Sequence, residues 1–426
     1  MQFQFRSAGQ LIFGPGEHRK AVAYARDLGR RVLLVTGASS LAQGGLLAPL
    51  QAALAERAEH VEHITVSGEP EVAHADALAQ QCREAACDVV LAIGGGSVLD
   101  IGKAVAALSQ NPGSAIEYLE DVGRGPPQPL RHAPLPVVAV PTTAGSGSEV
   151  TRNSVLKVPA LRVKRSLRSD LLLPRVAIVD PDLLQTAPRR VAAAAGMDAL
   201  THLIEAYLSK GAQPITDVLC TRGIELLWPA LHQLAAVHAT ESPTESPTGL
   251  ASAPSTLHPH LALASLWGGI ALANAGLGAV HGLVAPLGGQ CGVAHGDGCA
   301  CLLPATFAAN ARAIFAQAQP GPAAERLRLL VQLLTQAPRD RNLPADTGTG
   351  VDLDQAVERL STLRQRLGIL SLAEQGVSPD QFASIVAQSR GGSMRSNPVE
   401  LSDEALFDIL QQSLRLSPEQ APSPRS

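Results

Sequence analysis

The chain contains 426 residues, of which 46% are hydrophobic and 17% charged, with 34 Lys and Arg against 38 Asp and Glu. This composition excludes wholesale disorder and a collagen-like repeat, and the near-neutral charge argues against a nucleic-acid partner. No stretch approaches the roughly 18 uninterrupted apolar residues of a membrane helix, and neither a signal-peptide pattern nor a disulfide framework is present, so we expect a reduced, cytoplasmic protein without a membrane partner.

The first half of the chain predicts short apolar strands that alternate with helices. We expect strands at 2–5 and 10–13, which would form an opening hairpin, and then at 31–36, 61–66, 88–93, 137–140 and 176–179. Helices are expected between them at 17–28, 46–58, 72–86 and 98–109. Because the middle strands are apolar on nearly every residue, both faces of their sheet should be covered. This pattern predicts a doubly wound, Rossmann-like α/β domain over residues 1–187.

After Pro188 the strand signals disappear, and we expect an all-α domain over residues 188–426. Its helices are predicted at 191–208, 215–236, 261–275, 323–335, 353–367 and 403–414. Ser, Thr, Pro and Ala dominate 238–258, which predicts a flexible surface insert, and the Pro/Ser-rich 417–426 predicts a frayed tail.

A glycine-rich turn follows the buried strand at 88–93 and leads into a helical pattern. It consists of Gly94, Gly95, Gly96 and Ser97. Glycines let the backbone approach a pyrophosphate, and free N–H groups at a helix start bind one. The turn matches neither G-x-G-x-x-G nor a Walker loop, so the alternative is a plain strand–helix connection in which Ser97 caps the helix and Asp100 completes a capping box.

A second polar loop follows the strand at 137–140 and favours the phosphate-binding interpretation over the plain strand–helix connection. The segment PTTAGSGSE at 141–149 contains Thr142, Thr143 and Ser146. Hydroxyl and N–H groups at the carboxyl end of a parallel strand face the crevice where such sheets bind ligands. Two such loops after two buried strands favour a dinucleotide site.

Four residues of the second half are candidate metal ligands. Asp198 and His202 are four residues apart, so the helix predicted at 191–208 places them on one face. His281 and His295 bracket a later segment. One carboxylate and three imidazoles suit Fe²⁺ or Zn²⁺, and a cation would offset the cost of burying Asp198 among apolar neighbours. The alternative is that each His is an ordinary core residue.

Residues near these candidates give weaker signals. Glu205, one turn beyond His202, either orients a ligand or lies on the helix surface. Cys291, Cys299 and Cys301 lie close to His295, but no C-x-x-C is present. The sequence therefore favours small buried thiols over a thiolate site.

These residues resemble the iron-containing (group III) alcohol dehydrogenases over roughly residues 5–415. The motifs that carry the resemblance are GGGSVLDIGKA at 94–104, PTTAGSGSEVT at 141–151, VKRSLRSDLLLPRVAIVDP at 163–181, GMDALTHLIEAYLS at 196–209, NAGLGAVHGLVAPLGG at 274–289 and HGDGCACLLP at 295–304. The resemblance implies a dinucleotide-binding domain followed by a helical domain, with the substrate and the metal in the cleft between them.

By position, the resemblance assigns roles to individual residues. It implies that the metal ligands, through which catalysis occurs, are Asp198, His202, His281 and His295. It implies that Gly95, Gly96 and Ser97 contact the pyrophosphate. Thr142, Thr143 and Ser146 are implied on the nicotinamide side, and Lys164 at the cofactor ribose.

Three departures from the family pattern matter. Ala285 stands where many members have a further His, so a proton-relay role does not carry over. Gly37 stands where NAD-preferring members have an Asp, and Ala38, Ser39 and Ser40 follow it, so NADP should be tolerated. The insert at 238–258 is longer than the usual connection, and we assign it no function.

The sequence therefore predicts reversible hydride transfer between a small alcohol and its aldehyde or ketone, with Fe²⁺ or Zn²⁺ and with NAD or NADP as cofactors. We expect a homodimer or a larger homo-oligomer. One alternative is a metal-dependent lyase or synthase on the same scaffold, which the one-Asp, three-His set disfavours. The other is a catalytically silent nucleotide-binding protein, which the complete set of ligands and cofactor loops disfavours.

Overall fold

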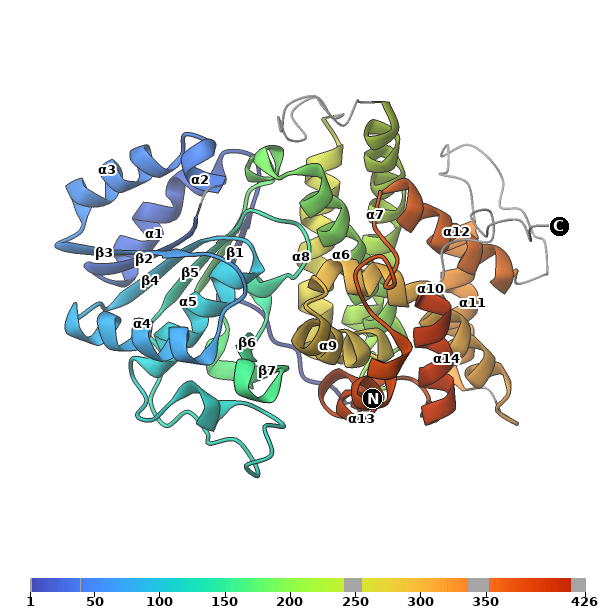
Figure 1. Cartoon of the computed structure of the whole chain (residues 1–426). Helices are drawn as coiled ribbons and strands as arrows, with labels where there is room; N and C mark the ends of the chain where they lie inside the picture. The colour runs from blue at the N-terminus through green and yellow to red at the C-terminus, as the bar shows by residue number, and fades with distance from the viewer. Residues whose placement is uncertain (1, 39, 241–254, 320, 336–351, 415–426) are drawn as a thin grey trace.

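A computed structural model describes residues 2–38, 40–240, 255–319, 321–335 and 352–414, and it consists of an α/β half followed by a helical half (Figure 1). Within these ranges the strands are β1 (Gln10–Phe13), β2 (Arg31–Gly37), β3 (His60–Val66), β4 (Val89–Gly94), β5 (Val137–Pro141), β6 (Asn153–Val158), β7 (Val163–Arg168) and β8 (Val176–Val179). All but β6 and β7 form one parallel sheet in the order β1-β8-β5-β4-β2-β3, while β6 and β7 form a separate antiparallel pair.

The helices of the α/β half are α1 (Ala21–Leu28), α2 (Ser40–Gln43), α3 (Leu47–Arg57), α4 (Val72–Glu84) and α5 (Gly96–Leu108). Those of the helical half are α6 (Arg189–Leu208), α7 (Pro214–Thr240), α8 (Leu257–Ala275), α9 (Ala279–Cys291), α10 (His295–Phe315), α11 (Pro322–Thr335), α12 (Leu353–Arg366), α13 (Phe382–Ser389) and α14 (Asp403–Leu414). Short 3-10 helices are η1 (Glu17–Lys20), η2 (Ala115–Tyr118), η3 (Ser148–Val150), η4 (Pro159–Leu161), η5 (Asp170–Leu172), η6 (Pro181–Thr186), η8 (Pro379–Gln381) and η9 (Gly392–Ser396).

Helices cover both faces of the parallel sheet, as the apolar strands predict. Successive strand residues point to opposite faces, so Leu33 and Val90 pack against α4 and α5. Their neighbours Leu34 and Leu91 pack against α1 and α3 on the other face. The doubly wound fold class is confirmed.

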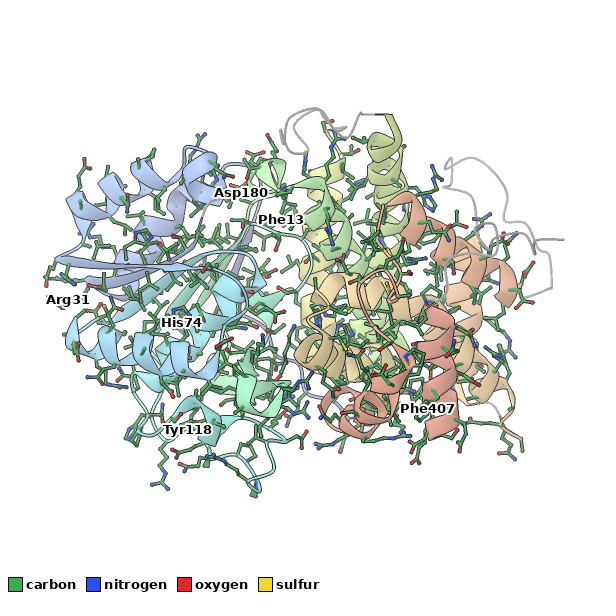
Figure 2. The ribbon with its side chains drawn as sticks, in the orientation of Figure 1. Phe13, Arg31, His74, Tyr118, Asp180 and Phe407 are labelled. Atoms are coloured by element: carbon green, nitrogen blue, oxygen red, sulfur yellow. The ribbon has the colours of Figure 1, made fainter. Side chains whose placement is uncertain are left out.

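The carboxyl ends of the parallel strands face the helical half. Figure 2 shows Phe13 and Asp180, at the ends of β1 and β8, on that side, whereas Arg31, at the start of β2, lies on the far side. Because β4 and β5 are neighbours in register, Gly94 lies beside Pro141, and the two polar loops that follow these strands lie side by side. Ligands of such sheets bind at this edge.

The helical half has a core of its own, with α6 at its centre. Every residue of α6 from Gly196 to Leu208 is buried, because α7, α8 and α10 surround it. A helix buried on all sides is normally apolar all round, yet α6 carries Asp198, His202 and Glu205. Such buried polar groups require partners.

The expected opening hairpin is wrong. Residues 2–5 form no strand, and β1 pairs in parallel with β8 at the edge of the sheet. The segment before β1 instead lies against the helical half, where the backbone N–H of Arg6 donates to Asn274 Oδ1 (2.6 Å) and the Asn274 amide donates back to the Arg6 carbonyl (2.7 Å). These bonds tie the residue that follows the expected strand at 2–5 to α8.

Other boundaries also differ from the expectations. The expected insert at 238–258 is helical at both ends, since α7 continues to Thr240 and α8 begins at Leu257. Residues 241–254 and the expected tail at 417–426 lie outside the described residues. Strands β6 and β7 and helices α9 and α10 were not expected as such.

All six cysteines lie in the described part of the chain and are free. Among the described helices, α10 is long and apolar enough to cross a membrane by length and composition, and so is the bent pair α8 and α9 if it forms one span. In α10, 72% of the most apolar window is buried inside the protein, which is typical of a core helix.

Candidate metal and cofactor site

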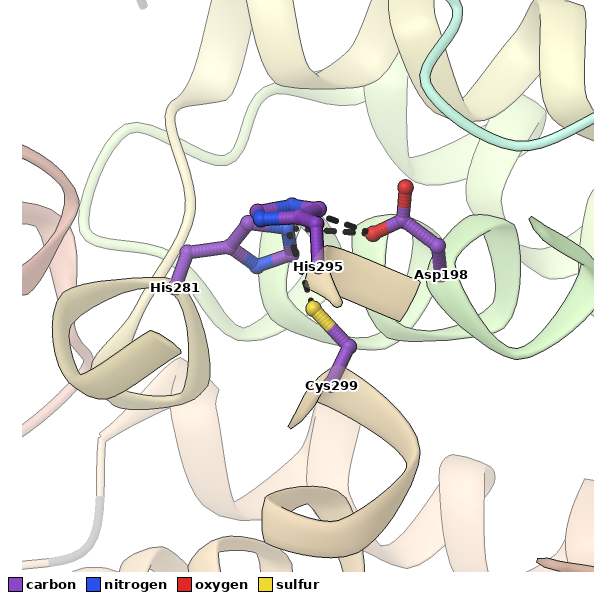
Figure 3. Close-up of side chains that lie close together, drawn as sticks. All are labelled: Asp198, His281, His295 and Cys299. Atoms are coloured by element: carbon purple, nitrogen blue, oxygen red, sulfur yellow. Dashed lines mark hydrogen bonds and ion pairs between the residues drawn. The ribbon is translucent and has the colours of Figure 1, made fainter. Parts of the chain in front are cut away.

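Three helices of the helical half bring four of the predicted residues together. Asp198 and His202 lie one turn apart on α6, His281 lies in the first turn of α9, and His295 is the first residue of α10. Figure 3 shows the carboxylate of Asp198 pointing at the imidazoles of His281 and His295. The ring of His202 stacks on that of His281 with 4.7 Å between centroids.

The distances within this cluster match those around a bound cation. The Nε2 atoms of the three imidazoles lie 3.4 Å (His281), 3.5 Å (His295) and 3.7 Å (His202) from the same atom, Asp198 Oδ1. This oxygen is buried and accepts no hydrogen bond. Two donors about 2.1 Å from one ion in a tetrahedral arrangement are about 3.4 Å apart. The donor atoms of Asp198, His281 and His295 lie within 4.8 Å of one another, which fits Fe²⁺ or Zn²⁺, and His202 is placed beside them by its distance to Asp198.

The protonation states of Asp198, His202 and His295 suit a cation. Burial opposes ionisation of Asp198, but the imidazoles of His202 and His295 hold the pKa of its carboxyl below the ordinary value. Desolvation by the surrounding protein lowers the pKa of His295 to about 4, although its side chain is 43% exposed at the cleft, so this imidazole is neutral near pH 7. Burial also lowers the pKa of His202. An anionic carboxylate and neutral imidazoles are the forms that bind metals, so Asp198, His202 and His295 are in the binding form, whereas His281, whose pKa is raised, releases a proton when a metal binds.

Glu205 orients His281. Its Oε2 lies 2.7 Å from His281 Nδ1, and its Oε1 accepts the backbone N–H of Val280 at 2.7 Å. A hydrogen on Nδ1 leaves the Nε2 lone pair free to face the cluster. Burial lowers the pKa of His281, but Cys299, Asp198 and Glu205 together raise it well above the ordinary value. Of the two alternatives for Glu205, the structure shows the orienting position and excludes the helix surface.

A cleft of about 580 Å³ connects this cluster to the sheet edge. Its lining from the α/β half includes Gly96, Ser97, Thr143, Ser146 and Lys164, together with charged residues such as Glu69 and Arg168. Its lining from the helical half includes the four clustered residues, Ala285 and Leu272. The volume is typical of small-molecule and cofactor sites.

The glycine-rich turn forms the start of α5 at this cleft. Gly94 ends β4, Gly95 precedes the helix, and no side chain caps the helix start. The expected alternative, capping by Ser97 with Asp100, is therefore not formed, and the Asp100 carboxylate instead accepts from the Ser148 hydroxyl. An uncapped helix start that lines a cleft is an anion-binding arrangement.

The second polar loop packs against this turn. The backbone N–H of Thr142 donates to the Gly94 carbonyl at 3.0 Å. A Cβ on Gly95 would lie 3.4 Å from Thr143 Oγ1, and one on Gly96 would lie 2.7 Å from Ser146 Oγ. Position 96 therefore requires glycine, because Ser146 occupies the space where a side chain would lie.

The other predicted cofactor residues are more widely spread. Lys164, on β7, lies in the cleft with its ammonium paired to the Glu69 carboxylate. Gly37 ends β2, the strand beside β4, and Ser39 lies outside the described residues.

Sequence reasoning did not assign a role to two further features of the site. The Cys299 thiol lies in the cluster, where its Sγ and the ligand atoms of Asp198, His281 and His295 are all within 4.8 Å of one another. The sequence signal for this position is that Cys299 follows His295 by four residues, which places the two side chains together only if this segment is helical. In addition, Arg190 donates to the Asp297 carboxylate at the cleft wall, at 3.2 Å.

Comparisons with known proteins agree with this geometry. The family model "Iron-containing alcohol dehydrogenase" matches residues 8–181, and the model of the C-terminal part of that family matches residues 192–414. Long-chain-alcohol dehydrogenase 1 of Geobacillus thermodenitrificans is 35% identical over 305 residues, which are 70% of this chain and 72% of that protein. A crystal structure of a 1,3-propanediol oxidoreductase is similar with a TM-score of 0.81 at 29% identity, covering 97% of this chain and 100% of the other. That of sulfoacetaldehyde reductase from Bifidobacterium kashiwanohense, in complex with NAD⁺, is similar with a TM-score of 0.76 at 27% identity, covering 97% and 99%.

Proposed function

The chain belongs to the iron-containing alcohol dehydrogenase family and is a metal-dependent alcohol dehydrogenase, and on this premise we propose which of its residues carry the reaction. In this proposal Asp198, His202, His281 and His295 bind Fe²⁺. The observation that carries it is the buried Asp198 Oδ1, which three imidazole Nε2 atoms approach to 3.4–3.7 Å while it accepts no hydrogen bond. Zn²⁺ has the same ligand preferences and is the second candidate.

The chemistry divides between the cofactors and the protein. When bound, the cation acts as a Lewis acid toward the alcohol oxygen, and the nicotinamide accepts the hydride. The chain supplies position: the α5 N-terminus at Gly96 and Ser97 binds the pyrophosphate, and Thr142, Thr143 and Ser146 hold the nicotinamide side.

NAD is the proposed cofactor, and NADP is proposed to be tolerated. A relative of this fold binds NAD⁺, which supports the first statement. The second rests on Gly37, because no carboxylate stands at the end of β2 to repel a 2′-phosphate. Lys164 is proposed to contact the cofactor ribose after release from Glu69.

The proposed substrate is a small alcohol or its aldehyde. Relatives named for long-chain alcohols, 1,3-propanediol and 4-hydroxybutyrate indicate a family in which the chain length and polarity of the substrate vary. On the side of the helical half, the cleft lining includes the small and apolar residues Ala194, Leu272 and Ala285. Ala285 has no group to accept the alcohol proton, so we propose that this proton leaves through water or the cofactor ribose.

We also propose two domains, 1–187 and 188–426, and a cytoplasmic homodimer or larger homo-oligomer. Neither nucleic acid nor a membrane is a proposed partner. The domain division is supported by the change from strands to helices between β8 and α6.

A panel of alcohols and aldehydes, run with NAD and NADP on Fe²⁺-reconstituted protein, tests this function. The expected result is net formation of reduced cofactor from alcohol and its consumption by aldehyde, measured by absorbance. A lyase or synthase would convert its substrate without net NAD(P)H. A silent nucleotide-binding protein would bind the cofactor and convert nothing, and either outcome would refute the proposal.

A further inference from the structure

Cys299 faces the same point in space as the candidate metal ligands. Its side chain is fully buried, and its Sγ lies 3.8 Å from His281 Nε2. Its Sγ and the donor atoms of Asp198, His281 and His295 all lie within 4.8 Å of one another. Figure 3 shows the thiol pointing from α10 toward the imidazoles.

Helix geometry explains why the thiol points there. His295 begins α10 and Cys299 follows four residues later, so both side chains lie on one face about a turn apart. Cys301, two residues further on, points away from the cluster, and its Sγ donates to the carbonyl of Leu370 at 3.0 Å. The two buried thiols of α10 therefore have different surroundings.

The separation between Cys299 and His281 is the one expected across a bound ion. With a metal–sulfur distance of about 2.3 Å and a metal–nitrogen distance of about 2.1 Å, two ligands at roughly tetrahedral or wider angles are about 3.6–3.8 Å apart. A second observation points to the same ion, because the buried Asp198 Oδ1 accepts no hydrogen bond.

We propose that Cys299 is a further ligand of the metal, so that the site combines carboxylate, imidazole and thiolate donors. The proposal rests on the metal site of the proposed function. On binding, the metal–sulfur bond forms, the S–H bond breaks, and the proton leaves to solvent, as it does when any cysteine binds a divalent cation. A thiolate makes the donor set softer, which favours Zn²⁺ over Fe²⁺ relative to a site without it.

Cobalt substitution tests this in the full-length protein. Apoprotein is titrated anaerobically with Co²⁺, whose visible ligand-field bands report the site and whose near-ultraviolet sulfur-to-cobalt charge-transfer band reports a bound thiolate. Wild type should show both bands, Cys299→Ser only the ligand-field bands, and the matched control Cys301→Ser both. Removal of Cys299 should also shift the competition between Zn²⁺ and Fe²⁺ toward Fe²⁺.

The outcomes separate this inference from the proposed function. Ligand-field bands without a charge-transfer band in wild type, or a charge-transfer band that survives in Cys299→Ser, would overturn the thiolate ligand and leave the metal site standing. No ligand-field bands in any of the proteins would overturn both. X-ray absorption of zinc-loaded wild type needs no variant, and it should show one sulfur at about 2.3 Å. A shell of nitrogen and oxygen alone would refute the proposal.

Discussion

Substitution of Glu205 tests how much the orientation of His281 contributes to metal binding, because Glu205 contacts His281 but is not itself a proposed metal ligand. In Glu205→Gln the carbonyl oxygen still accepts the N–H of Val280, but an amide NH₂ replaces the acceptor that faces His281 Nδ1. His281 then favours the tautomer with its hydrogen on Nε2, the atom that faces the metal. We expect the metal affinity to fall about 10–100-fold, as for other partners of metal-bound His, with little change in the fold.

Competition with a chromogenic chelator measures this affinity. Glu225→Gln is the matched control, because Glu225 is a partly exposed residue of α7 paired with Arg222, and it should leave the affinity unchanged. An unchanged affinity in Glu205→Gln would show that Glu205 does not orient His281.

Part of the site is visible from residue spacing alone. Asp198 and His202 share a helix face at a spacing of four, and that inference needs only the helical pattern around them. Their convergence with His281 and His295 depends on how α6, α9 and α10 pack, which no local pattern encodes. Cys299 shows the same limit, since its Gly- and Cys-rich surroundings carry no helical signal.

The end of β2 is the element that we expect to set cofactor choice. Gly37→Asp places a carboxylate at the carboxyl end of this strand, where it repels a 2′-phosphate and accepts from ribose hydroxyls. We predict that the parent accepts NADP and that the variant shifts toward NAD. The measurement is kcat/KM for both cofactors in both proteins. Strong rejection of NADP by the parent, or an unchanged ratio in the variant, would contradict this assignment.

Helix α8 crosses the loop after β5 at two glycines, Gly269 and Gly147, so their backbones are in direct contact. Gly147 has a φ of +59°, which favours glycine, and a Cβ on Gly269 would lie 2.6 Å from the Gly147 carbonyl oxygen. In Gly269→Ala the backbones must separate, so we expect a loss of about 1–3 kcal/mol in the free energy of unfolding. Cofactor affinity should fall as well, because Ser146 lies on the displaced loop.

Denaturant unfolding and cofactor titration measure the two effects. Gly321→Ala is the control, because Gly321 has open space around its Cβ position; it should change the free energy of unfolding by less than about 1 kcal/mol and leave cofactor affinity unchanged. A Gly269→Ala protein with wild-type stability would mean that the contact is not tight.

Among the strands and helices, the sequence predicts those that a local pattern of apolar residues determines. Continuous apolar runs identify β2, β4, β5 and β8, because strands covered on both faces have no polar residues to interrupt them. The strands β6 and β7 carry charged residues such as Lys157 and Arg165, so they lack that signal. The hairpin expected at 2–5 and 10–13 is wrong because β8, far along the chain, competes for β1 and α8 holds Arg6.

One part of the pH dependence of the stability of the whole molecule should come from a buried acid. Glu149, in η3, is 2% exposed, and burial raises the pKa of its carboxyl from 4.5 to about 7, against the opposing effect of Lys103. The native state therefore binds this proton more tightly than the unfolded chain. The resulting stabilisation is complete below pH ~4.5 and is lost as the pH rises to ~7, by about 3 kcal/mol.

Glu149→Gln should remove this part of the pH dependence. Urea unfolding of the metal-free proteins at pH 5 and pH 7.5 gives the comparison, in which the wild type should lose more stability than the variant on going to the higher pH. Equal losses in the two proteins would show that Glu149 titrates alike in the folded and unfolded states.

The central claim is that alcohol oxidation depends on a metal held by the buried Asp198 and His cluster. The most direct test strips the protein of metal anaerobically, returns Fe²⁺ in steps, and measures the rate of reduced-cofactor formation against bound iron. We predict no activity in stripped protein, a linear rise, and a plateau at one iron per chain, while His281→Ala folds but stays inactive and binds iron weakly. Full activity in the stripped protein, or in metal-free His281→Ala, would contradict it.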